Sequence, residues 1–351
     1  MTPAQNTIGD PAQHDPGRQS RRAVAWGLGL LVASSLLVLL GVSVGSTGVE
    51  RVIGRLLHDP IASQIVWDIR LPRTLGAWAA GALLGLAGAV AQGLFRNPLA
   101  DPFLLGSASG ASLGIAVAMA LFGVSPLAVQ WLARIGMAGA AFVGAVLAVM
   151  LTLQLARGVQ HTLRLLLAGV IVGVVLSAAR DLVTLAAPDI LQALQGFMLG
   201  SASFVGWAAC LLMLGVWLLC VLAAWGLSPA LDGLSLGEAT AASLGLPLPA
   251  MRAALVGVLA LATGTAVAQT GLIAFVGLAA PHLVRSVVKT THTGLILLAS
   301  LTGGVLLAAA DILARWLMAP QELPVGVLTA VLGGSYLLWL MHRTGHWRST
   351  L

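Results

Sequence analysis

Few side chains in this sequence are of the types that catalyse reactions or bind metal ions. Lys289, the only lysine, follows Val288 where a phosphate-binding loop requires glycine, so the chain cannot build that ATP site itself. The run Gly106–Gly110 has Ala108 where the nucleophile of a G-x-S-x-G elbow would stand. None of the seven histidines stands at zinc-ligand spacing from a cysteine. We therefore predict no catalytic residue, no metal site and no cofactor bound by this chain.

The charged residues are sparse and are separated by long uncharged runs. Only 9% of the 351 residues are charged and 58% are hydrophobic, and nine uncharged runs span 15 to 42 residues each. A bilayer core about 30 Å thick requires roughly 20 apolar residues per helix. The sequence therefore predicts an all-α polytopic membrane bundle, and it excludes a soluble protein, a disordered chain and a nucleic-acid binder. Runs of this length also exclude a β-barrel, whose strands are short and alternate in polarity.

Small residues are distributed so that helices can approach each other closely. The chain holds 42 glycines, and several pairs stand four residues apart, which places them on one helix face. The clearest pairs are Gly81/Gly85, Gly110/Gly114 and Gly169/Gly173. Cys210 and Cys220 lie in one apolar run, and we expect both to be small core residues.

Basic residues at both ends of the chain set the predicted topology. Arg22 precedes the first apolar run and Arg343 follows the last, so the positive-inside rule places both termini in the cytoplasm and requires an even number of spans. Ten spans result if the run 253–284 divides at Gly271 and the run 190–231 holds a short helix plus one span. We expect residues 1–22 to form a disordered cytoplasmic tail, residues 23–342 one transmembrane domain, and residues 343–351 a cytoplasmic tail.

A short string occurs twice and suggests an internal repeat. The sequence 89–92, Ala-Val-Ala-Gln, recurs at 266–269, and each copy is followed by a proline, Pro102 or Pro281. In a ten-span topology the two helices run in opposite directions. Inverted repeats of this kind are typical of transporters.

Several strings in colinear order resemble one family. They are Trp67–Thr74, Gln92–Pro102, Leu165–Val170, Leu236–Ala239 with Leu244–Pro247, Gly271–Leu278 with Pro281–Arg285, and Glu322–Val327. Together they resemble the FecCD-type permeases, which are membrane subunits of ATP-driven (ABC) importers for iron-siderophores, haem and cobalamin. The resemblance covers roughly residues 67–340.

The resemblance implies an assembly rather than a single chain. It implies ten transmembrane helices, a homodimer with a central pathway, two separate ATPase subunits that use ATP and magnesium, and a periplasmic substrate-binding protein. The location it implies is the bacterial inner membrane, within the lipid bilayer. The permease itself would be non-catalytic and would work by alternating access.

The loop 227–251, called here the coupling segment, would contact the ATPase. Leu236 to Leu244 can form a short helix with Ser235 as N-cap and Gly245 just beyond its end. The alternative is a plain interfacial loop helix. The resemblance implies that the residues bearing on the ATPase are Leu236, Gly237, Glu238, Ala239, Leu244 and Gly245.

Three arginines are predicted at the outer face. The resemblance implies that Arg70, Arg73 and Arg315 receive glutamates of the binding protein. The alternative is that each is an interfacial anchor or an ion-pair member, because Asp311 and Arg315 stand four residues apart on one helix face.

The resemblance also implies a gate and a pathway residue. Asn97, Leu99 and Thr162 would form the cytoplasmic gate, although 97–98 is also an ordinary Asn-Pro turn. Arg180 would line the pathway and pair with an anionic substrate such as the haem propionates, or it would simply pair with Asp181. On this arginine the sequence favours haem as substrate, with iron-siderophore or cobalamin as alternatives.

Three other functional classes were weighed against an ABC permease. A secondary, ion-coupled transporter would need an intramembrane carboxylate, and Asp311 is the one helix-centre candidate. A membrane enzyme would need a nucleophile and a base, which the sequence does not pair. A purely structural subunit would not need the clustered loop motifs.

Overall fold

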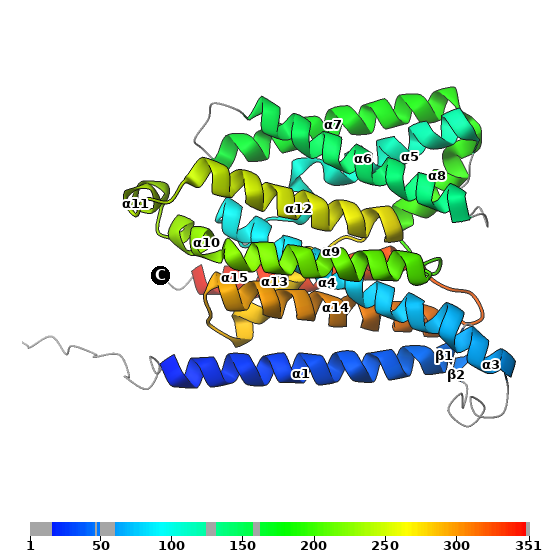
Figure 1. The fold of residues 1–351 in the computed structure, drawn as a ribbon, viewed down its shortest axis with the longest axis horizontal. Coiled ribbons are helices and arrows are strands. Elements are labelled where there is room, and N and C mark those ends of the chain that lie inside the picture. Colours follow the sequence, from blue (N-terminus) through cyan, green and yellow to red (C-terminus); the bar gives the residue numbers. More distant parts are fainter. Residues whose placement is uncertain (1–15, 46–47, 50–59, 124–130, 157–161, 349–351) are drawn as a thin grey trace, which may run out of the picture.

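The computed structural model describes residues 16–45, 48–49, 60–123, 131–156 and 162–348, and these form a bundle of helices (Figure 1). The longer helices are α1 (Pro16–Ser43), α4 (Leu71–Phe95), α5 (Ser107–Phe122), α6 (Trp131–Leu155), α7 (Thr162–Ala186), α9 (Trp207–Gly226), α12 (Leu248–Thr270), α13 (Val276–Val287), α14 (His292–Leu317) and α15 (Val325–Arg348). The shorter ones are α3 (Pro60–Ile65), the π-helix η2 (Val66–Arg70), the 3-10 helices η3 (Pro102–Leu105) and η4 (Pro188–Ile190), α8 (Leu191–Leu199), α10 (Ser228–Ser235) and α11 (Glu238–Ser243). Two-residue strands β1 (Val44–Gly45) and β2 (Gly48–Val49) pair antiparallel. The predicted all-α class is confirmed.

The long helices lie alongside one another, so the bundle has two ends. The start of α1, α10, α11 and the C-terminal end of α15 lie at one end, called here the α11 end (Figure 1). The strand pair, α3 and α8 lie at the opposite end, called here the α3 end. Both described termini therefore share the end that carries the coupling segment, as the predicted topology requires.

Seven helical segments in the described residues are long and apolar enough to cross a membrane. They are Gln19–Ser43, Pro60–Phe95, Gly136–Leu155, Arg164–Ala186, Trp207–Gly226, Leu248–Thr270 and His292–Leu317, and two shorter apolar helices are Ser107–Phe122 and Val325–Trp339. The predicted division at Gly271 is confirmed, because α12 ends at Thr270, Gly271 has φ +70° and α13 starts at Val276. The run 190–231 holds the short helix α8 and the span α9, also as predicted.

The two predicted tails overlap the ends of α1 and α15. Helix α1 begins at Pro16 and α15 continues to Arg348, so parts of both supposed tails are helical. Charge marks where a span leaves the apolar layer, whereas arginine and glutamine are good helix formers that let the helix continue past it. Residues 1–15 and 349–351 lie outside the described residues.

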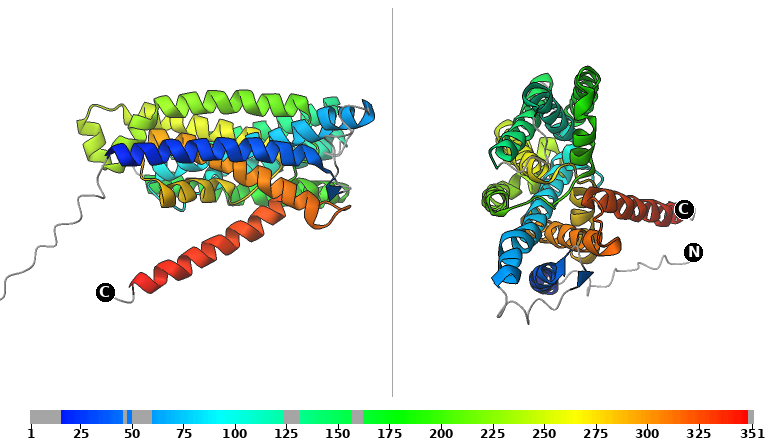
Figure 2. Two further views of the ribbon diagram at one scale, coloured as in Figure 1. Left: turned by 90° about the horizontal axis from the view of Figure 1, so that it is seen from below. Right: turned by 90° about the vertical axis from the view of Figure 1, so that its right-hand side faces the viewer.

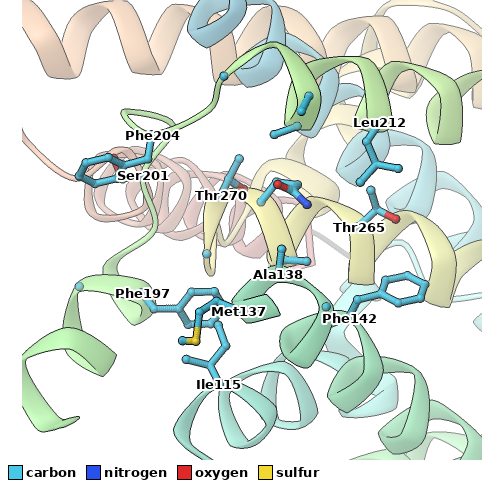
Figure 3. A pocket seen from close by; sticks show the side chains of 18 of the residues that line it. Ile115, Met137, Ala138, Phe142, Phe197, Ser201, Phe204, Leu212, Thr265 and Thr270 are labelled. Carbon is cyan, nitrogen blue, oxygen red and sulfur yellow. The ribbon is translucent and has the colours of Figure 1, made fainter. Parts of the chain in front are cut away.

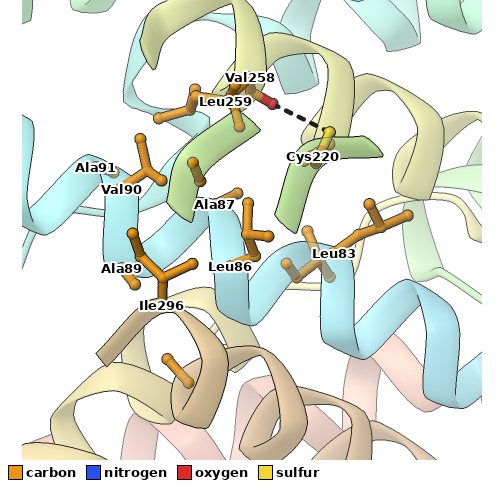
Figure 4. Packing of buried hydrophobic residues seen from close by; sticks show 14 of the residues in the cluster. Leu83, Leu86, Ala87, Ala89, Val90, Ala91, Cys220, Val258, Leu259 and Ile296 are labelled. Atoms are coloured by element: carbon orange, nitrogen blue, oxygen red, sulfur yellow. Dashed lines mark hydrogen bonds between the residues drawn. The ribbon is translucent and has the colours of Figure 1, made fainter. Parts of the chain in front are cut away.

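Helix α4 is the centre of the bundle. All of its 25 residues are buried except Leu71, Leu75 and Trp78. Its alanines, leucines and valines pack against α9, α12 and α14, where Cys220, Leu259 and Ile296 complete the cluster (Figure 4). Cys210 and Cys220 are both buried free thiols, which confirms their predicted core role.

Glycines bring α4 into backbone contact with α14. A Cβ added at Gly81 would lie 2.3 Å from the carbonyl oxygen of Gly303, and one at Gly85 would lie 2.3 Å from that of Ala299. The same device joins α5 to α6, where a Cβ at Gly110 would lie 2.2 Å from the oxygen of Gly144. Without a hydrophobic drive between helices in lipid, such close approach is a main source of packing energy.

Polar side chains add specific links across the same helices. Trp217 Nε1 of α9 donates to Ser300 Oγ of α14 at 2.7 Å, and Ser300 Oγ donates to the carbonyl oxygen of Ala82 of α4 at 3.0 Å. Trp78 Nε1 of α4 donates to Ser34 Oγ of α1 at 2.9 Å. Helices α1, α4, α9 and α14 are thereby fixed in register.

Helix α15 diverges from the rest of the bundle. It starts beside α8 and α14 at the α3 end and then extends away from the other helices (Figure 2). Three of its apolar residues each have more than half of their surface exposed: Val331, Leu338 and Trp339. This helix therefore carries an apolar surface that its own chain does not cover.

Candidate functional site

The coupling segment forms two short helices that project at the α11 end (Figure 1). The predicted short helix is present as α11, but it begins at Glu238 instead of Leu236, because Gly237 adopts φ +106° and separates α11 from α10. Ser235 caps no helix and instead donates to the carbonyl oxygen of Asp232 at 2.6 Å. Gly245 has φ +77°, which confirms its predicted place beyond the end of the helix.

Ion pairs and hydrogen bonds attach the coupling segment to the long helices. Glu238 Oε1 lies 2.7 Å from Arg252 Nη2, so α11 is tied to the start of α12. Asp232 Oδ1 accepts from the backbone N–H of His292 at 3.1 Å and lies 2.7 Å from its Nδ1, so α10 is tied to the start of α14. A carboxylate at that helix N-terminus is also favoured by the helix dipole. The coupling segment is therefore linked by side chains to the starts of both α12 and α14.

The same segment presents uncovered apolar groups. Leu236 is 66% exposed and Leu244 is 62% exposed, and they flank α11 on either side. Ala239 between them is exposed as well. Exposed leucines next to the apolar spans are compatible with both predicted alternatives, a contact with an ATPase and a helix at the membrane interface.

The predicted gate residues lie at the same end but are only partly described. Asn97 Oδ1 accepts from the backbone N–H of Leu99 at 2.9 Å, and both residues are exposed in the turn that follows α4. The ordinary turn is therefore present. Thr162 begins α7, and its side chain lies outside the described residues. A gating role for these three residues stays a prediction.

Two of the predicted docking arginines lie inside a buried charge cluster at the α3 end. Arg73 Nη1 lies 2.9 Å from Glu322 Oε2, and Arg73 Nη2 lies 3.1 Å from Asp311 Oδ1. Arg315 Nη2 lies 2.7 Å from Asp311 Oδ2, which is the ion pair that the four-residue spacing suggested. The Arg315 and Asp311 side chains are 2% and 1% exposed. This buried charge cluster (Arg73, Asp311, Arg315, Glu322) joins α4, α14 and the loop before α15.

Additional hydrogen bonds extend the cluster to α1. Arg315 Nη1 donates to the carbonyl oxygens of Gly41 at 3.0 Å and Val44 at 3.2 Å. Ser203 Oγ, from the loop between α8 and α9, donates to Glu322 Oε2 at 2.9 Å. Buried charges need this many partners because desolvation is costly. The arginines thus have structural partners, and their side chains do not project from the surface.

Arg70 is placed differently from Arg73 and Arg315. It ends the π-helix η2, is only partly buried, and donates to the carbonyl oxygen of Val42 at 3.2 Å. Of the three predicted docking residues it is therefore the one nearest to solvent. Docking by any of the three stays a prediction.

Arg180 is paired with its neighbour. Its Nη2 lies 2.6 Å from Asp181 Oδ1, and its side chain is 19% exposed while that of Asp181 is 67% exposed. Its Nη1 also faces the Met198 sulfur of α8 at 3.8 Å. The local ion pair weighed from the sequence is present, and contact of Arg180 with a substrate stays a prediction.

Sequence reasoning missed several contacts because they join residues far apart in the chain. Glu322 as a partner of Arg73, and His292 as a partner of Asp232, have no spacing signal. Another is the contact of Arg285 with Gln92, which links α13 to α4 within the first Ala-Val-Ala-Gln string. The four-residue spacing of His342 and His346 was also overlooked, although no group of three candidate metal ligands occurs in the part of the chain that the structure describes.

Comparison with known proteins identifies the family. The model of the FecCD transport family matches residues 30–343, nearly the whole chain. The chain belongs to the FecCD transport family. Its FecCD relatives include the vitamin B12 import system permease protein BtuC of Salmonella paratyphi A, which is 38% identical over 92% of this chain and 97% of the relative. BtuC of Escherichia coli O157:H7 is 37% identical over 93% of this chain and 98% of the relative.

Solved structures agree with this FecCD assignment. An inward-facing metal-chelate-type ABC transporter matches with a TM-score of 0.81 and 28% identity, covering 90% of this chain and 98% of that one. PsaBC from Streptococcus pneumoniae matches with a TM-score of 0.55 at 19% identity, covering 82% of this chain and 93% of that one. The latter shows a shared fold alone.

Proposed function

We propose that this chain is the membrane permease subunit of an ABC importer for a large metal chelate of the cobalamin class. The observation that carries the proposal is similarity over nearly the full length to permeases of vitamin B12 import systems. The structurally similar transporter is of the metal-chelate type, which fits the same substrate class. An iron-siderophore is the alternative within the family.

Haem, the substrate favoured from the sequence, is not supported. The named relatives are cobalamin permeases, and the arginine that suggested propionate binding already pairs with Asp181. A guanidinium that already pairs with a carboxylate 2.6 Å away binds a second anion more weakly than an unpaired guanidinium would. The preference therefore moves from haem to cobalamin.

An ion-coupled transporter is also less favoured than an ATP-driven one. Asp311, the carboxylate that such a mechanism would need, lies against two guanidinium groups at 3.1 and 2.7 Å. A carboxylate held by two arginines is neutralised and is a poor site for a proton or sodium ion. The exposed leucines of the coupling segment, in contrast, are available to contact an ATPase.

ATP hydrolysis would act on this chain through the coupling segment. In the proposed assembly two ATPase subunits contact Leu236, Ala239 and Leu244, and their closure pushes α11. Glu238–Arg252 and Asp232–His292 would transmit that push to α12 and α14 as a rigid-body shift. No bond chemistry is required of the permease.

The remaining parts of the proposed assembly follow from the two ends of the bundle. With the α11 end in the cytoplasm, both described termini are cytoplasmic and the α3 end faces the periplasmic binding protein. If the 12-residue helix α13 is counted as a tenth span beside the seven long and two shorter apolar helices, the number is even, as this topology needs. A second copy of the chain would cover the apolar surface of α15 and form the central pathway.

Transport by the purified assembly tests the proposal. The permease and its ATPase are reconstituted in liposomes with the binding protein, and uptake of cyanocobalamin, haem and a ferric siderophore is measured with and without ATP. ATP-dependent uptake of cyanocobalamin is expected. Uptake driven by a proton or sodium gradient without ATP would refute the ABC assignment, and uptake of only the siderophore would refute the cobalamin assignment.

The coupling role has its own test. Glu238→Gln removes the charge that holds Arg252 but leaves the exposed leucines in place. We expect ATP hydrolysis to continue while uptake falls, because α11 no longer moves α12. Asp189→Asn is the control variant, because it also removes one carboxylate charge but lies in η4, toward the α3 end. Uptake by Glu238→Gln equal to that of the control would remove the coupling assignment.

A further inference from the structure

A pocket of about 980 Å³ lies between helices α6, α8, α9 and α12 toward the α3 end (Figure 3). That volume is at the upper end of the roughly 300–1,000 Å³ typical of small-molecule sites. Neither the coupling segment nor the buried charge cluster contributes a residue to its lining. Arg180 does not line it either, so the pocket is separate from the residues that the proposed function uses.

The lining is mostly apolar, and of its amide and hydroxyl side chains all but Thr265 lie toward the α3 end. Gln192, Ser201, Gln269 and Thr270 lie at the α3 end of the pocket, because they come from the ends of α8 and α12 and from the loop that follows α8. Deeper in the bundle the walls are formed by Phe142, Val216 and Leu261 of the three long helices. In Figure 3, Ser201 and Phe204 lie at one side of the pocket and Phe142, Leu212 and Thr265 lie at the other.

The depth of the pocket matches one leaflet of a bilayer. From Gly271 to Leu261 the wall contributed by α12 spans ten residues, which at 1.5 Å per residue is about 15 Å. Half of a hydrocarbon core about 30 Å thick has the same depth. The end that holds Gln192 and Gln269 lies where α8 and α12 reach the end of the bundle, so in a bilayer that matches the apolar spans it would lie near the headgroup and ester region.

No charged side chain lines the pocket, and this excludes several ligand classes. A metal chelate with ionised carboxylates would find no counter-ion there, and a free cation would find no carboxylate. An acyl chain needs only apolar walls, whereas the ester and phosphate oxygens of its headgroup can accept hydrogen bonds from the Gln192 and Gln269 amides. The order of apolar depth and polar rim is that of a phospholipid.

We propose that this pocket binds one acyl chain of a phospholipid from the leaflet at the α3 end, with its ester region against Gln192 and Gln269. The bound acyl chain would fill the space between α6 and α9 and hold α8 against α12. That junction is otherwise formed by backbone contact, since a Cβ at Gly271 would lie 2.3 Å from the carbonyl oxygen of Phe197. The lipid would be a structural ligand of the permease and not its cargo.

Two glycines of α6 offer a matched pair of variants. Gly139 lines the pocket, Gly136 does not, and a Cβ added at either position would meet no atom within 4 Å. Gly139→Phe therefore places a ring at the pocket without a backbone clash, while Gly136→Phe adds the same ring to the same helix outside it. Both variants should fold, because neither disturbs a packed glycine.

The experiment measures phospholipid retained by the full-length protein after extraction from phosphatidylcholine nanodiscs and exchange into detergent. Native mass spectrometry should show wild-type protein and Gly136→Phe with one bound phospholipid, and Gly139→Phe without it. Equal retention by both variants would overturn the proposal, as would a bound species with the mass of a free fatty acid. Quenching of Trp207, which also lines the pocket, by phosphatidylcholine brominated on the acyl chain gives a second readout. The contribution of Trp207 is the quenching that disappears when Trp207 is replaced by phenylalanine. This contribution should be smaller in protein that carries Gly139→Phe than in protein that does not. An equal contribution in both would contradict the site.

Discussion

Replacing Asp311 by asparagine should be among the most damaging single changes in the chain. Asp311 is 1% exposed, and its two oxygens neutralise Arg73 at 3.1 Å and Arg315 at 2.7 Å. An uncharged side chain of the same shape leaves Arg315 as a buried charge with only carbonyl and hydroxyl partners. Breaking a buried ion pair from one side costs about 3–5 kcal/mol.

Glu322 provides the matched comparison, because it belongs to the same cluster but is nearer to solvent. Its side chain is 25% exposed, and after Glu322→Gln the guanidinium of Arg73 keeps Asp311. We expect that change to cost about 1 kcal/mol or less, as for partly exposed pairs. A third variant, Asp311→Leu combined with Arg315→Met, removes the pair together and should recover much of the loss.

Thermal stability in detergent distinguishes these cases. Each variant is heated, and the fraction that still elutes as a monodisperse peak is followed by size-exclusion chromatography. Asp311→Asn should lower the midpoint several times more than Glu322→Gln. If the two variants behaved alike, or if Asp311→Asn behaved like wild type, the cluster would not hold α4, α14 and the loop before α15 together.

Three further changes test other parts of the structure. Gly81→Ala should destabilise the bundle by about 1–3 kcal/mol in the same thermal assay, since the new methyl group would meet the backbone of α14. Gly29→Ala is the control, because a Cβ added there meets no atom within 4 Å. Equal stability of the two variants would contradict the close packing of α4 against α14. Burial raises the pKa of Asp101, in the loop between α4 and α5, so its contribution to stability is present below the ordinary carboxyl pKa and is lost as pH rises through the raised value. Asp101→Asn should therefore raise the thermal midpoint at pH 7 and lose that gain in acid, and a gain independent of pH would exclude the charge as its cause. Arg70→Glu should weaken binding of the periplasmic partner in detergent without lowering the thermal midpoint; unchanged affinity would remove Arg70 from the docking surface.

Local backbone requirements could be predicted from the sequence. Gly271 and Gly245 were expected at breaks and both adopt positive φ, because glycine is favoured where the chain must turn in that way. The glycine pair Gly81/Gly85 also packs as its spacing suggested. Each of these predictions depends on residues within a few positions of one another, so one sequence contains the whole signal.

Long-range pairings could not be predicted in the same way. Arg73 and Glu322 are 249 positions apart, and nothing in either segment indicates the other. The docking role expected for Arg73 and Arg315 came from the family resemblance, whereas the sequence alone offered an interfacial anchor or an ion pair for each arginine. Only the fold shows that α14 places Asp311 between them. The spacing of Asp311 and Arg315 was the one local hint of that cluster.

The distribution of tight and loose contacts defines which parts of the permease can move together. Helices α4 and α14 meet through glycine backbones and share the Ser300 hydrogen bonds and the Asp311 ion pairs, so sliding between them would break several contacts at once. Since α10 is anchored to the start of α14, a force on the coupling segment should displace this pair as one body. Beyond its start, the described part of α15 contacts the other helices through fewer groups, such as the edge-to-face contact between the rings of Tyr336 and His282. In the proposed transport cycle we therefore expect the α4–α14 pair to move as one body against the less tightly packed α15.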